Sequence, residues 1–160
     1  LVGAEMCIRD RFMDAHIGAT VTLADIAASA NVCPRECQRI FGRYLHERPM
    51  AYMQRLRVFR AAQMLAEKTA HFAKEMGVTY GRITIREQKT RWGSCSSAGN
   101  LNYNWKLVLM PERVMDYVVI HELAHRKEMN HSARFYAVVA QQMPDYKVWQ
   151  SWLKEHGREY

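Results

Sequence analysis

The sequence has no long apolar run and no secretion pattern. No stretch approaches the roughly 18 apolar residues of a membrane-spanning helix, and the first residues lack the basic region and apolar segment of a signal peptide. Internal repeats, linkers and low-complexity runs are also absent. We therefore expect a globular cytoplasmic protein that does not interact with membranes.

Cysteine is scarce and irregularly spaced. The 160 residues include four cysteines, none of them in a Cys-x-x-Cys pair. This spacing excludes a zinc ribbon and a disulfide framework, and it suits reduced thiols. The length is enough for one medium domain or two small ones.

The net charge of +7 is concentrated in one segment. Residues 31–60 contain seven arginines and two glutamates, whereas the rest of the chain is nearly balanced. Nucleic acid is one partner that such a segment fits. A solvated basic face is the alternative explanation, and composition does not separate the two.

Two short helices are predicted in this N-terminal region. Thr22 can cap the first helix, which should end near Ala30, and Pro34 suits the first position of the second. The second helix would present basic and amide side chains outward, as the recognition helix of a helix-turn-helix protein does in a major groove of DNA. The candidate DNA-contacting residues are Arg35, Gln38 and Arg39.

The run at residues 21–41 is followed by RPMAY at 48–52 and RLR at 55–57. Together these motifs resemble the first half of an AraC-type transcriptional regulator DNA-binding module, over residues 20–68. The resemblance implies DNA binding through residues 34–44. In that family the long helix leads into a second helix-turn-helix, which this chain lacks, so we expect DNA binding to be weak.

The C-terminal part contains histidines with metal-ligand spacing. His121 and His125 stand four residues apart, so on a helix both imidazoles can reach one ion. Glu122 is offset by roughly 100° of helical rotation, which suits a base better than a ligand. His131 would return from beyond the helix end as the third ligand.

An ordinary amphipathic helix with two unliganded histidines is the alternative explanation. The apolar run at residues 118–120 argues against it, because unpaired polar groups on a buried helix are costly to desolvate. Three protein ligands and an open fourth position indicate a catalytic Zn²⁺. Glu122 would activate a zinc-bound water for hydrolysis. The oxyanion donor is not identified: Arg91, Arg134 and Tyr136 are within reach by fold analogy, but a structural role is favoured for each.

After residue 70 the pattern changes to strands and turns. Residues 82–86 alternate between polar and apolar side chains, as a half-buried strand does. Two further extended pieces, residues 91–95 and 101–105, flank turn-forming residues at 96–100, which predicts a hairpin. We therefore expect a domain boundary near residue 70.

Five motifs lie in this part of the chain: RWGSCS (91–96), NLNYNW (100–105), LVL (107–109), DYVVIHELAH (116–125) and NHS (130–132). Together they resemble the C-terminal half of the YgjP-like metal-dependent hydrolases, a zincin group related to SprT-like and WLM metalloproteases, over residues 71–160. The resemblance implies that His121, His125 and His131 bind zinc, that Glu122 is catalytic, and that the hairpin flanks the active-site helix. The N-terminal sheet usual in that family is missing.

These observations predict an α+β protein. Residues 70–160 would form a zincin-like catalytic domain with a small antiparallel sheet and an HExxH helix, and residues 12–69 an all-α helix-turn-helix segment. Residues 1–11 have no clear period and resemble a translated adaptor or assembly sequence, so we interpret them as a non-native tail. The chain is either a natural fusion or a joining of fragments of two genes, and the incompleteness of both halves favours the second.

The predicted function is zinc-dependent hydrolysis, of the metallopeptidase type, acting on a peptide. One alternative is a nucleotide pyrophosphohydrolase, an activity also attached to YgjP-like proteins, with a nucleotide as substrate. The other is an AraC-type DNA-binding regulator in which the C-terminal segment is inert.

Overall fold

The computed structural model describes residues 2–160, with side chains described from residue 9 onward. The chain divides into two compact units, Leu1–Phe59 and Arg60–Tyr160. The helix α4, Pro49–Met76, runs through the division. Among the residues described, no helix is both long enough and apolar enough to cross a bilayer.

The first unit is helical, as expected. Its elements are α1 (Val2–Ala15), α2 (Leu23–Ala28), α3 (Pro34–Tyr44) and the start of α4. Thr22 caps α2 in a capping box: its Oγ1 accepts from the Asp25 backbone N–H at 3.3 Å, and its own N–H donates to the Asp25 carboxylate at 2.8 Å. Pro34 begins α3, and Asn31, with φ of 53°, lies in the turn between α2 and α3.

The core of this unit joins all of its helices. It contains fully buried apolar side chains, including Met13, Ile26, Cys37, Phe41 and Met53. The expected non-native tail, residues 1–11, falls within α1 apart from Leu1, which lies outside the described residues.

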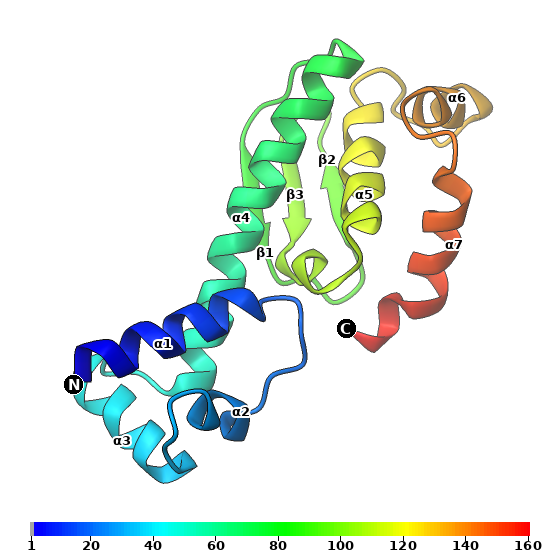
Figure 1. Cartoon of the computed structure of the whole chain (residues 1–160). Helices are drawn as coiled ribbons and strands as arrows, with labels where there is room; N and C mark the ends of the chain where they lie inside the picture. The colour runs from blue at the N-terminus through cyan, green and yellow to red at the C-terminus, as the bar shows by residue number, and fades with distance from the viewer. Residues whose placement is uncertain (1) are drawn as a thin grey trace. The chain divides into compact units, whose positions relative to one another are not determined.

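The second unit is mixed, which confirms the α+β class (Figure 1). After α4 come β1 (Ile83–Arg86), β2 (Gly93–Cys95), β3 (Leu101–Asn104), the 3₁₀ helix η1 (Trp105–Leu109), α5 (Glu112–Ala124), α6 (Ala133–Gln142), α7 (Tyr146–His156) and the 3₁₀ helix η2 (Gly157–Glu159).

The sheet has the order β1-β3-β2. The predicted hairpin is confirmed: β2 pairs antiparallel with β3, with Gly93 opposite Tyr103. The expectation of a wholly antiparallel sheet is wrong for the other pair, because β1 runs parallel to β3, with Ile83 opposite Leu101. The loop after β1 carries the chain to the far edge, where β2 begins, and the hairpin then returns β3 to the centre in the direction of β1.

The helix α4 runs to Met76, past the expected domain boundary near residue 70. It ends instead before Gly77, whose φ of 63° lies in the left-handed region that glycine adopts at low cost. The Val78 N–H donates to the Ala73 carbonyl at 3.0 Å, as in a Schellman motif. Burial of Thr69 and Ala73 explains the added turns, because they place this stretch in the core.

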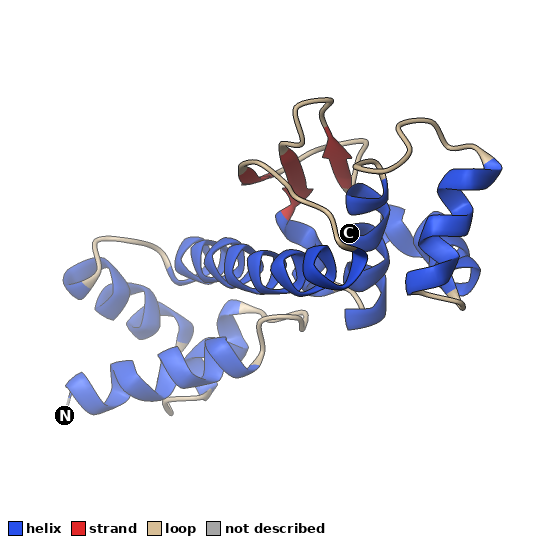
Figure 2. Cartoon of the chain, turned by 90° about the horizontal axis from the view of Figure 1, so that it is seen from above, coloured by secondary structure: helices blue, strands red, loops and turns tan. Residues whose placement is uncertain are grey.

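Two helices pack on the same face of the sheet (Figure 2). Thr69 of α4 lies 3.2 Å, Oγ1 to OH, from the buried Tyr103 of β3, and Glu122 of α5 lies against Gly93, the residue opposite Tyr103. Lys68 joins the two helices through Asp116, with Nζ 2.6 Å from Oδ1. The helix α5 is therefore fixed against both the hairpin and α4.

Candidate metal centre

The helix α5 brings the first two histidines out of the core. Residues 118–120 are almost fully buried, so the helix packs on several sides and its end is held in place. His121 lies in its last turn and His125 is the C-cap residue. His131 lies in the loop before α6, which begins after the capping residue Ser132.

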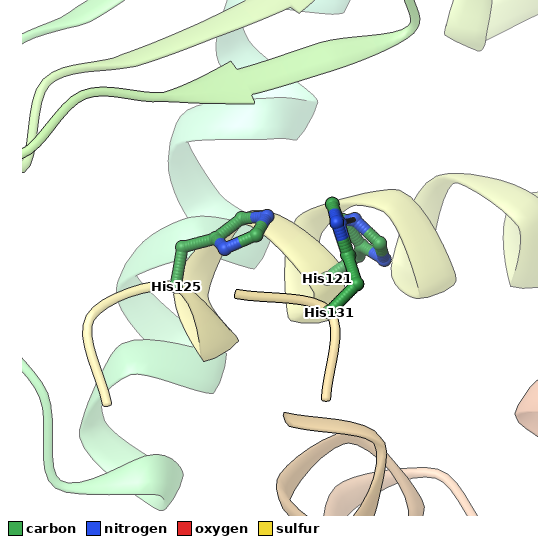
Figure 3. A group of neighbouring side chains, drawn as sticks. All are labelled: His121, His125 and His131. Atoms are coloured by element: carbon green, nitrogen blue, oxygen red, sulfur yellow. Dashed lines mark hydrogen bonds between the residues drawn. The ribbon is translucent and has the colours of Figure 1, made fainter. Parts of the chain in front are cut away.

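The three imidazole rings converge, as Figure 3 shows. The Nε2 atoms of His121 and His131 are 3.0 Å apart. One ring nitrogen from each of the three histidines can be chosen so that all three atoms lie within 4.8 Å of one another. Two ligands about 2.0–2.1 Å from a tetrahedral zinc ion stand about 3.3 Å apart, so this grouping fits one cation with small adjustments.

The protonation of the histidines also fits a metal. The Nδ1 atom of His125 lies 3.3 Å from the Glu128 carbonyl oxygen, which only accepts, so Nδ1 carries the proton and Nε2 is bare. Burial, together with the neighbouring His125 and His131, lowers the pKa of His121 to about 3. Neutral imidazole is the form that binds metals.

Phe135, fully buried in α6, packs against all three histidines. Its ring centroid lies 4.8 Å from that of His121, 4.6 Å from that of His125 and 4.8 Å from that of His131. This ring fixes the imidazoles from one side and excludes water there. The sequence contains a signal for it, since Phe135 follows His131 by four residues.

Glu122 is buried against the hairpin. Only 6% of the residue is exposed. A Cβ added at Gly93 would lie 2.6 Å from the Oε1 atom of Glu122, so the carboxylate occupies the space that a side chain at residue 93 would fill. Burial raises the pKa of Glu122 to about 8, against an opposing effect of Arg91. A cation held by the histidines would favour the carboxylate form.

Tyr117, one turn before His121 on α5, is a further neighbour of the site. Its hydroxyl oxygen lies 3.5 Å from the His121 Nδ1 atom. Burial raises the pKa of Tyr117 to about 12, so it remains a neutral phenol that can hydrogen-bond to the outer nitrogen of His121.

Arg126, immediately after the motif, connects the end of α5 to the hairpin turn. Its guanidinium donates to the Thr79 carbonyl at 3.0 Å and to the Ser97 carbonyl at 3.2 Å. Gly99, with φ of 82°, leaves room for this group, because a Cβ there would lie 2.8 Å from the Arg126 Cζ atom. The hairpin that contacts Glu122 is therefore tied to α5 at a second point.

A cavity of about 220 Å³ adjoins Glu122. The residues that line it include Arg91, Trp92, Tyr117, His121 and Glu122. Of the three oxyanion candidates, Arg91 alone lines this cavity. Tyr136 lies outside this cavity but beside His131, with ring centroids 6.3 Å apart; its hydroxyl accepts a hydrogen bond from Gln150 and its ring stacks on Tyr146. Arg134 is exposed on α6.

The candidate DNA-contacting residues lie elsewhere, on α3. Arg35, Gln38 and Arg39 are exposed there. Arg39 donates two hydrogen bonds to the Glu36 carboxylate, at 2.9 and 2.6 Å, so it is the most restrained of the three.

A model of the YgjP-like metallopeptidase domain matches residues 32–156. The chain belongs to the YgjP-like family. The match begins within the segment that resembles a regulator and covers the three histidines, Glu122 and the hairpin. Membership supports hydrolysis assisted by a metal ion, and the three histidines are a group that could hold one.

Two solved structures share the fold. The metallopeptidase zymogen of Pyrococcus abyssi abylysin has a TM-score of 0.52 and 24% identity, with 59% of this chain and 96% of that chain covered. The zymogen of Methanocaldococcus jannaschii jannalysin has a TM-score of 0.51 and 20% identity, with 60% and 97% covered. Both likenesses confirm a metallopeptidase-like architecture.

A shorter similarity involves a transcriptional regulator. The HTH-type regulator GbdR of Pseudomonas aeruginosa, from strains UCBPP-PA14 and PAO1, is 36% identical over 55 residues. These residues make up 34% of this chain and 15% of the regulator. The chain thus spans a small part of the regulators that it matches.

Proposed function

We propose that this chain is a zinc-dependent hydrolase of the metallopeptidase type. Zinc would bind His121, His125 and His131, and Glu122 would act as the general base. The observation that carries this proposal is the convergence of three imidazoles beside a carboxylate that the fold has buried. We assign this role to a catalytic domain of residues 70–160.

Zinc would supply a coordinated water of lowered pKa and would polarise the substrate carbonyl as a Lewis acid. Glu122 takes one proton from the attacking water, whose oxygen forms a bond to the carbonyl carbon. When the C–N bond breaks, Glu122 gives that proton to the leaving nitrogen, and the second water proton passes from the new carboxylic acid to the amine, so that the products are a carboxylate and an ammonium group. Gly93 and Phe135 hold the carboxylate and the imidazoles in place through the contacts described above.

Replacement of Glu122 by Gln tests this role. The variant keeps the side-chain volume but removes the base, so we expect it to retain zinc and to lose peptide cleavage by at least about a hundredfold. Cleavage of a quenched-fluorescence peptide library and metal content are measured on the same sample. Undiminished cleavage by the variant would exclude Glu122 as the base.

A nucleotide pyrophosphohydrolase would use the same residues, so the assay includes nucleoside triphosphates with detection of released pyrophosphate. We place peptides first because the family model and both solved structures are metallopeptidases. Faster hydrolysis of a triphosphate than of any peptide would reverse this order.

A second candidate function is DNA binding by a segment comprising residues 12–69. The exposed side chains of α3 and the similarity to GbdR favour it. We expect weak binding that falls steeply with salt and decreases further in Arg39→Ala. Fluorescence anisotropy with labelled duplex DNA at several salt concentrations measures both effects. Absence of binding at low salt would leave the segment without a nucleic-acid role.

A further inference from the structure

A second cavity, of about 580 Å³, adjoins the cavity at Glu122. Four residues line both: Thr90, Arg91, Trp92 and Leu153. A ligand bound at the metal centre can therefore extend into it. Its volume lies within the range of about 300–1,000 Å³ that is usual for ligand sites. We refer to it as the basic cavity.

The basic cavity is strongly cationic. The charged side chains that line it are Lys89, Arg91, Lys106, Lys154, Arg158 and Glu87. Glu87 is paired with Lys106, with Oε1 3.1 Å from Nζ. Between residues 9 and 160, the other four cations have no carboxylate within ion-pair distance. Like charges that face one volume repel one another, and a bound anion would relieve this repulsion.

The cations come from separate parts of the unit. Lys89 and Arg91 lie in the loop between β1 and β2, Lys106 in η1, and Lys154 and Arg158 in α7 and η2. A merely solvated basic face would be expected along one helix, whereas these side chains converge from three segments. Two of the walls are in close contact, because a Cβ at Gly157 would lie 3.1 Å from the Trp92 indole nitrogen.

We propose that the basic cavity is a substrate subsite that binds an acidic side chain, glutamate or aspartate, of a peptide held at the metal centre. The inference rests on the proposed function, because it takes the peptide as the substrate. Arg91 belongs to both cavities, so it would contact the peptide between the acidic side chain and the bond that is cleaved. The subsite would give the enzyme a preference for acidic peptides.

Binding of matched peptides tests the subsite independently of turnover. The full-length, zinc-loaded Glu122→Gln variant is titrated with labelled peptides that differ only by Glu or Gln at successive positions, and fluorescence anisotropy reports binding. We expect the best Glu peptide to bind about tenfold more tightly than its Gln counterpart, because several modest charge interactions add. Lys154→Glu combined with Arg158→Glu should abolish this preference.

Lys147→Glu is the matched control. Lys147 is an exposed residue of the same helix, α7, and lies outside both cavities, so its reversal lowers the net charge by two units, as each of the two substitutions in the double variant does, but should preserve the preference. Equal binding of both peptides, no binding of either, or a preference that survives in the double variant would overturn the proposal.

Two further outcomes separate the subsite from the proposed function. If the Glu preference depends on Lys154 and Arg158 but the native protein cleaves no peptide, the subsite stands and the peptidase function fails. Inorganic tripolyphosphate is titrated in parallel. If it binds more tightly than the best Glu peptide and loses this binding in the double variant, the occupant is a phosphate compound and the peptide subsite is overturned.

Discussion

Replacement of Gly93 by alanine should uncouple catalysis from metal binding. The added Cβ would lie 2.6 Å from Oε1, 2.8 Å from Cγ and 2.9 Å from Cδ of Glu122. Non-bonded atoms are comfortable at about 3.5–4.0 Å, so the carboxylate must move by roughly 1 Å. The Glu122 side chain is buried between its own helix, α5, and β2, so the carboxylate would shift toward the adjoining cavity and leave its native position.

A displacement of about 1 Å in a reacting group can cost about a hundredfold in rate, or about 2.7 kcal/mol of activation free energy. We therefore expect kcat for peptide cleavage to fall about a hundredfold in Gly93→Ala, with zinc content unchanged because the three atoms nearest to the new methyl group all belong to Glu122. Steady-state kinetics and metal analysis on one preparation measure the two quantities.

Gly42→Ala is the control, since an added Cβ at this α3 position meets nothing within 4 Å. It should leave turnover unchanged and should stabilise the helix slightly. Native kcat in Gly93→Ala would refute the claim that Gly93 positions the base. Loss of zinc together with activity would instead indicate that the whole centre is disrupted.

Two other predictions concern stability. Phe135→Ala removes a fully buried ring that packs against the histidines, so it should lower the free energy of unfolding by about 3–5 kcal/mol and weaken zinc binding. Phe59→Ala, at an exposed position, should have neither effect. Urea denaturation measures the change in stability, and zinc titration measures the change in affinity. The hydrogen bond from Lys68 holds the pKa of Glu112 in the folded protein below its usual value. The ionised carboxylate therefore stabilises the fold at any pH above the pKa that Glu112 has in the unfolded chain. This stabilisation is lost as the pH falls through the lower pKa of the folded protein. Urea titrations should accordingly show that the native chain is more stable than Glu112→Gln at pH 6 and that this difference vanishes at low pH. A difference that persists at low pH would contradict a stabilising role for the Glu112 carboxylate.

Local chemistry accounts for the features that the sequence predicted well. Thr22 and Asp25 form a capping box within four residues, and Pro34 fixes a helix start, so neither depends on distant parts of the chain. The helical spacing of His121 and His125 likewise fixes their common face. These features are set by backbone geometry over one or two turns.

The features that the sequence did not predict depend on long-range packing. The extension of α4 to Met76 reflects burial of Thr69 and Ala73 against residues far along the chain. The parallel pairing of β1 with β3 depends on the path of the intervening loop. Gly93 carries no local sign that Glu122 will occupy its empty side-chain position, 29 residues later in the chain.

The basic cavity was also beyond sequence reasoning. Its cations are dispersed between residues 89 and 158, in a region whose net charge is unremarkable, and they meet only in the folded unit. The sequence's conspicuous cluster of arginines lies instead in the N-terminal segment, at residues 31–60.

Zinc analysis of the purified full-length chain and of His121→Ala tests the central claim most directly. Elemental analysis after removal of loosely bound metal should give about one zinc per native chain and almost none in the variant, because two remaining imidazoles hold the ion weakly. A native chain without zinc, or a His121→Ala variant with full zinc occupancy, would contradict the assignment of the three histidines as the metal centre.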